Sequence, residues 1–148
     1  MAIQSNKLLV AGGVISGLAA VMHLACLVVG APLFRLMGAG EQMAQLYLAG
    51  HWYPTAITLA IATVLAGWSV YAFSGAGLLP KLPLRRTVLC AITAVYIVRG
   101  VAFVPVMAYF PGNSITFWVL SSSICLLAGI VHLFGLRQSW VRLSGGAA

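Results

Sequence analysis

Long apolar runs alternate with short polar segments along the chain. Charge-free stretches of 27, 39 and 37 residues follow Lys7, Glu41 and Arg99 in turn. A helix needs roughly 20 apolar residues to cross the hydrocarbon core of a bilayer. The first apolar run exceeds the ~7–15 residues of a signal-peptide core, so a retained span is favoured over a cleaved signal peptide. Four membrane-spanning helices are therefore predicted, over about 8–31, 54–74, 87–110 and 115–136.

Composition supports a membrane protein. Of the 148 residues, 62% are apolar and 6% are charged, whereas about a quarter of the residues in soluble domains are charged. So little charge cannot cover the surface of a soluble globule. An ordinary cytosolic enzyme, a disordered tail and a coiled coil are therefore excluded. We expect one all-α integral membrane domain over residues 1–148, a four-transmembrane-helix bundle with no separate soluble domain.

The distribution of positive charge predicts an orientation. Eight basic residues and one acid give a net charge of +7, but the cations are scattered and form no nucleic-acid-binding patch. Lys and Arg in short loops mark the cytoplasmic side. Both termini are therefore predicted to be cytoplasmic, with an outer loop over about 32–53, in a multi-pass protein of the cell membrane (the inner membrane in a bacterium). The six cations on the cytoplasmic side are Lys7, Lys81, Arg85, Arg86, Arg137 and Arg142.

Two connections between the spans carry further chemistry. The cations of the 75–86 loop are interpreted as a topology signal, with recognition of anionic lipid headgroups as the alternative. The outer segment 40–49 predicts a short amphipathic helix with Glu41 in its first turn, where the helix dipole favours an anion. The aromatic segment 51–54 follows it as an interfacial anchor. We expect this part of the chain to lie across the outer mouth of the bundle.

Small and weakly polar residues form a stripe on three of the predicted spans. Such residues allow the backbones of membrane helices to approach closely, so helix packing is the favoured interpretation. The alternative is a polar lining for a ligand cavity. The stripes include Ser16, Ala20 and His23 on the first span, Thr58 and Ser69 on the second, and Ser121, Cys125 and His132 on the fourth.

Arg99 is the most informative single position. It lies about 12 residues into the third predicted span, ~18 Å from the cytoplasmic end. Arg near the bilayer centre costs roughly 2.5–3.5 kcal/mol and faces a partner in the bundle interior. That partner is Glu41, if the outer loop folds inward, or an external anion, or a set of neutral groups; a pathway or gating charge is a further interpretation. The neutral candidates are Tyr96, Thr58, Ser121, Ser122 and backbone carbonyls.

His23 has three interpretations. It is a packed neutral histidine, a second group of an Arg99 site, or a metal or haem ligand. A bis-histidine haem needs both axial ligands at one depth, and His132 is predicted ~15 Å from His23 along the membrane normal. The sequence contains no metal-binding motif, so no metal site is predicted and the cofactor stays unspecified.

Two functional hypotheses follow. The favoured one is a non-enzymatic binding or accessory protein whose polar outer-half cavity around Arg99 accepts a lipid or small anionic ligand. The alternative is a small membrane enzyme or carrier that uses Arg99, His23 and Glu41. The sequence leaves open whether the chain works alone, as an oligomer or in a larger membrane complex. The candidate ligand-binding residues are Arg99, His23, Glu41, Tyr96, Thr58, Ser121 and Ser122.

Overall fold

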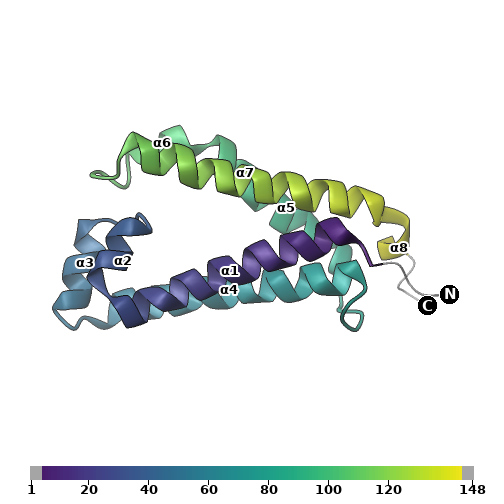
Figure 1. Ribbon diagram of the computed structural model, residues 1–148, viewed down its shortest axis with the longest axis horizontal. Coiled ribbons are helices and arrows are strands. Elements are labelled where there is room, and N and C mark those ends of the chain that lie inside the picture. Colours follow the sequence, from purple (N-terminus) through teal and green to yellow (C-terminus); the bar gives the residue numbers. More distant parts are fainter. Residues whose placement is uncertain (1–4, 145–148) are drawn as a thin grey trace.

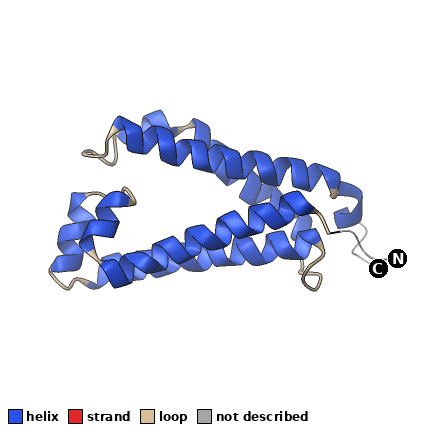
Figure 2. Cartoon of the chain, in the orientation of Figure 1, coloured by secondary structure: helices blue, strands red, loops and turns tan. Residues whose placement is uncertain are grey.

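The computed structural model describes residues 5–144. As expected, the structure is all-helical: 81% of the described residues are in helices, and no strand occurs between residues 5 and 144 (Figure 2). The helices of this described part are α1 (Lys7–Val29), α2 (Ala31–Leu36), α3 (Glu41–Leu48), α4 (Trp52–Ala76), α5 (Arg85–Val101), α6 (Phe103–Met107), α7 (Ile115–Gln138) and α8 (Trp140–Ser144).

Two helix pairs make up the molecule. α1 packs along α4, and α5 packs along α7. Figure 1 shows the two pairs meeting near the chain termini and diverging toward α2 and α3. We call the end with the termini the closed end, and the end with α2, α3 and the turn over residues 108–114 the open end. The pairs touch through contacts of α1 with α7 and of α4 with α5.

Asn6 holds the closed end together. Its side-chain oxygen accepts from the Leu9 backbone N–H at 3.0 Å and so caps α1. Its side-chain nitrogen donates to the Gly135 carbonyl at 3.0 Å and to the Ser139 hydroxyl at 2.8 Å. Its backbone N–H donates to the Ala76 carbonyl at 3.1 Å. One residue therefore links the start of α1 to the ends of α4 and α7.

Glycines permit the close approach of helices near this end. A Cβ added at Gly135 would lie 3.0 Å from the Leu9 backbone nitrogen, and one at Gly75 would lie 2.7 Å from a methyl carbon of Leu89. Packing of backbone against side chain at small residues is the usual way in which helices associate in lipid. The core around these contacts consists of Leu9, Ala72, Ala76, Leu89, Ile92, Tyr96, Ala128, Leu136 and Leu143.

Three of the predicted spans are confirmed as helices long and apolar enough to cross a membrane: α1, α4 and α7, among the described residues. The span predicted over 87–110 is broken. α5 ends at Val101, and α6 begins after Ala102. Pro105 explains the break, because its ring clashes with the carbonyl four residues earlier, at Val101, and it cannot donate to that carbonyl. With 17 residues, α5 alone is shorter than the roughly 20 residues that a span needs.

The outer segment folds as a helical hairpin. The helix predicted over 40–49 is confirmed as α3, whereas α2 was not predicted. α1 ends at Val29 and is followed by Gly30, whose φ of +81° is readily accessible only to glycine. The Phe34 ring packs at 5.1 Å from the Tyr47 ring, and the Tyr47 hydroxyl donates to the Leu27 carbonyl at 2.8 Å. The hairpin is thus fixed to the end of α1.

Candidate functional site

A cavity of about 420 Å³ lies at the open end. Every helix from α1 to α7 contributes at least one residue to its wall, so both helix pairs line the cavity. This volume falls in the range of small-molecule sites, roughly 300–1,000 Å³. Most of the lining is apolar. Its polar side chains include Arg99, His23 and Thr58, three of the residues singled out from the sequence.

Arg99 supplies the positive charge of the cavity. Its Nη1 donates to the Ser122 hydroxyl at 3.2 Å, and its guanidinium carbon lies 5.2 Å from the centre of the Trp118 ring, within the range of a cation–π contact. Because α5 breaks after Val101, Arg99 falls in the last turn of that helix. The negative end of a helix dipole stabilises a cation there.

His23 and Thr58 line the cavity from the opposite helix pair. Nδ1 of His23 lies 2.8 Å from the Ala19 carbonyl. A carbonyl can only accept, so Nδ1 carries the proton, and in the neutral ring Nε2 is an acceptor. Thr58 is buried, with 4% of its surface exposed. The cavity therefore combines the guanidinium of Arg99 with an imidazole and a hydroxyl group.

Tyr96 and Ser121 lie outside the cavity lining. The Tyr96 hydroxyl shares a hydrogen bond of 2.9 Å with the Ser16 hydroxyl inside the core. Ser121 donates to the Trp118 carbonyl within its own helix at 3.3 Å. Ser122 acts on the site through its bond to Arg99.

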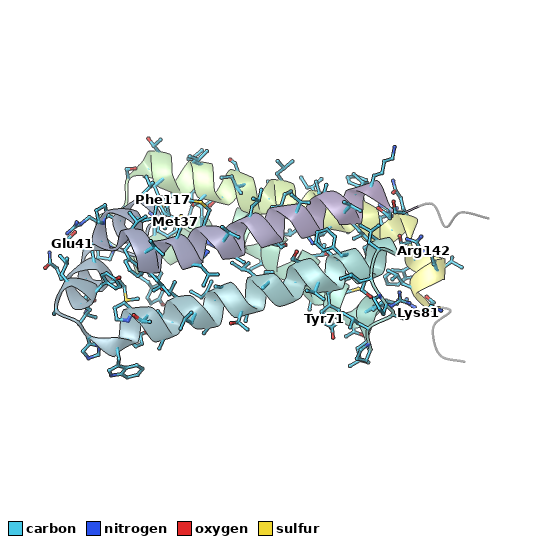
Figure 3. The ribbon with its side chains drawn as sticks, turned by 60° about the horizontal axis from the view of Figure 1, so that its bottom comes forward. Met37, Glu41, Tyr71, Lys81, Phe117 and Arg142 are labelled. Carbon is cyan, nitrogen blue, oxygen red and sulfur yellow. The ribbon has the colours of Figure 1, made fainter. Side chains whose placement is uncertain are left out.

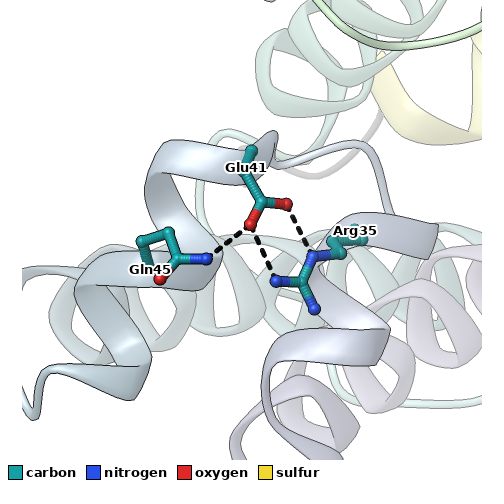
Figure 4. Close-up of polar contacts among 3 residues, drawn as sticks. All are labelled: Arg35, Glu41 and Gln45. Carbon is teal, nitrogen blue, oxygen red and sulfur yellow. Dashed lines mark hydrogen bonds and ion pairs between the residues drawn. The ribbon is translucent and has the colours of Figure 1, made fainter.

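Glu41 is held elsewhere. Its carboxylate accepts from Nε and Nη2 of Arg35 at 2.6 and 2.8 Å and from the Gln45 amide at 2.6 Å (Figure 4). The hydrogen bonds from Arg35, followed by that from Gln45, lower the pKa of Glu41 to about 2. The outer loop therefore does not bring the carboxylate to Arg99. The ion pair between Arg35 and Glu41 instead joins α2 to α3.

The side of the cavity at the open end has a cover that the sequence pattern did not predict. The Asn113 amide donates to the Gly38 carbonyl at 3.0 Å, and a Cβ added at Gly38 would overlap the Phe117 ring. Figure 3 shows Met37 and Phe117 close together at this end. We call Met37, Gly38, Asn113 and Phe117 the cover. No local sequence pattern links the residues of the cover, because they lie far apart in the chain. Trp118, which the sequence analysis also did not name as a partner of Arg99, lies one helical turn before Ser122 and could have been found by helical spacing.

Metal or haem binding gains no support from the described residues. They contain no group of three or more His, Cys, Asp or Glu side chains placed to hold a metal ion. His132 packs on Gly12, about three turns from His23 on α1, or roughly 16 Å at 1.5 Å per residue. The two histidines therefore do not face one ligand.

Comparison with protein-family models, with curated proteins and with solved structures finds no match. The functional argument therefore rests on the chemistry of the cavity.

Proposed function

We propose that this protein is a multi-pass membrane protein of the binding or accessory type, and that its cavity holds the anionic group of a lipid or small molecule against Arg99. One observation carries the proposal. The described residues give Arg99 one hydrogen-bond acceptor and one aromatic face, and no carboxylate. Guanidinium has five N–H donors, so an anion in the cavity would satisfy donors that the chain leaves open.

The charge balance of the chain strengthens this argument. Glu41 is the single acidic side chain in the sequence, and Arg35 already occupies it. A charged group inside a membrane protein marks a functional site by default, and its counter-ion has to be identified. For Arg99 the natural counter-ion is the ligand. The pairing of Glu41 with Arg35 also weakens the alternative, an enzyme or carrier that would use Glu41 together with Arg99.

Four crossings of the cell membrane complete the proposal. α1, α4 and α7 are long enough alone, and α5 with α6 forms the remaining crossing. A break in a spanning helix is tolerated where the backbone lines a cavity or is buried in protein. We place the closed end in the cytoplasm because Lys and Arg accumulate there. Lys81 and Arg142 lie at that end and Glu41 lies at the other (Figure 3).

The test is the retention of bound molecules by a variant without the charge. Arg99→Gln removes the charge and keeps a polar side chain. Arg137→Gln is the matched control, because Arg137 is exposed and does not line the cavity. Both proteins are purified in mild detergent and examined by native mass spectrometry and thermal unfolding. We expect the Arg99 variant to lose an anionic species that wild type and control retain.

A structural role for Arg99 gives a different result. If neighbouring groups satisfy the guanidinium, Arg99→Gln lowers the melting temperature and leaves the profile of bound molecules unchanged. That outcome rejects the binding function.

A further inference from the structure

The two sides of the cavity differ in exposure. The lining residues Cys26 of α1 and Trp118 of α7 are 2% and 3% exposed, and Cys26 packs beneath the α2–α3 hairpin, in one cluster with Phe34 and Ala44. Tyr53 and Ile61 of α4 and Phe110, after α6, also line the cavity, yet they are 44%, 40% and 42% exposed. The cavity therefore reaches the molecular surface between α4 and the segment that follows α6.

The exposed side consists of hydrophobic side chains, and the outer side is covered. Tyr53, Ile61 and Phe110 would face acyl chains or the membrane interface rather than bulk water. The hydrogen bond from Asn113 to Gly38 holds the cover over the outer side. A water-soluble anion would have to pass the cover, whereas a molecule in the bilayer meets an apolar opening directly.

The contents of the cavity match a molecule with one charged end. Arg99, the cation of the lining, shares the cavity with apolar lining residues that include Ile57, Met43 and Val106. At about 30 Å³ for a group the size of a water molecule, 420 Å³ holds roughly fourteen such groups. This is enough for a headgroup and most of one acyl chain, so a second chain would have to remain outside the cavity.

We propose that the ligand is a single-chain amphiphile with a carboxylate or phosphate headgroup, and that it enters sideways from the bilayer between α4 and the segment after α6. The headgroup binds Arg99, and the chain lies along the apolar wall toward Tyr53, Ile61 and Phe110. This inference rests on the proposed anion-binding function and adds the class of ligand and its route.

Radiolabelled palmitate in phosphatidylcholine vesicles is a suitable probe, with its transfer to immobilised protein followed over time. Ile61→Trp narrows the opening. Val64→Trp is the matched control, because Val64 is an exposed residue on the same helix that does not line the cavity. We expect the Ile61 variant to slow the transfer of palmitate about tenfold, since restricted access lowers association rates, and the control to match wild type. Acetate, which has the same headgroup and no chain, should not displace palmitate.

The outcomes separate the two proposals. If Arg99→Gln retains palmitate as wild type does, the anion-binding function itself fails. Two further outcomes apply if Arg99 is required for palmitate binding. If acetate displaces palmitate, the amphiphilic ligand is overturned, and if the Ile61 variant exchanges palmitate as fast as its control, the lateral route is overturned. Anion binding stands in both cases. If Ile61→Trp does not fold, Phe110→Ala tests the same opening by widening it: faster transfer supports the route, and an unchanged rate rejects it.

Discussion

At the scale of single residues, Gly12 and His132 set the distance between the two helix pairs. His132 is fully buried, and its Nδ1 lies 2.9 Å from the Ala128 carbonyl. A Cβ added at Gly12 would lie 2.6 Å from Cε1 of the His132 ring. The ring also packs 5.4 Å from the ring of Tyr96, centre to centre. With neighbours on several sides, the imidazole has little room to move away.

Gly12→Ala should therefore destabilise the protein. Overpacking of a tight core typically costs about 1–3 kcal/mol, and the methyl group here meets a clamped ring rather than the end of a flexible chain. Gly67→Ala is the control, because a Cβ added at Gly67 meets nothing within 4 Å; it should be neutral or stabilise α4 by up to about 1 kcal/mol. Thermal unfolding of both variants in one detergent provides the measurement. Equal melting temperatures for the two would contradict the packing described.

The sequence revealed some residue partners and not others. Ser122 is one of the neutral partners that the sequence offers Arg99, beside Glu41 and an external anion, because cost alone forces a central Arg inward. The partner of Glu41 was overlooked, although Arg35 is only six residues away. The bond between Tyr96 and Ser16 depends on the register of two helices, and apolar periodicity does not fix the height of one helix against another.

At the scale of elements, hydropathy located the long helices but not their interruptions. α1, α4 and α7 follow from length and apolar character alone. The break after Val101 comes from Pro105, whose surroundings are apolar, so a hydropathy average passes over it. α2 is likewise hidden, because its apolar residues continue the run of α1 past Gly30. The backbone geometry at Pro105 and Gly30 therefore sets the helix ends that the hydropathy pattern leaves undetermined.

The hairpin of α2 and α3 should respond to acid through one group. The pKa of Glu41 is lowered to about 2 from 4.5. A carboxyl whose pKa falls on folding stabilises the folded state above its unfolded pKa, and this contribution is lost as the pH falls through the folded pKa. The protection of the α2 and α3 amides against hydrogen exchange, measured against the intrinsic exchange rate at each pH, should therefore decrease as the pH falls from 4.5 to 2. Added salt should reduce the effect, since the pair is exposed and screened.

Glu41→Gln provides the control for this titration. The chain has no other acidic side chain, so the variant should show no such change in the same pH window. An identical acid response in the variant would assign the effect to another group.

At the scale of the whole molecule, the proposed orientation predicts which loops are accessible from outside. In a background with Cys26, Cys90 and Cys125 replaced by Ser, Gln42→Cys and Lys81→Cys place a single thiol at the open end and at the closed end. An impermeant maleimide applied to intact cells should label position 42, and position 81 should react only after the cells are permeabilised. Labelling of position 81 in intact cells would invert the topology.

The hydrogen bonds of Asn6 join the two helix pairs at the closed end, whereas at the open end the pairs diverge around a cavity and are connected through the cover. Across a bilayer, a body of this shape is a wedge whose cross-section differs between the two leaflets. The acyl chains of the leaflet around the broad end exert lateral pressure on the protein. This pressure acts on the separation of the helix pairs and thus on the volume of the cavity. If the protein spans the bilayer and binds a ligand as proposed, we expect occupancy of the cavity and curvature of that leaflet to be thermodynamically linked, so that each biases the other by the same free energy.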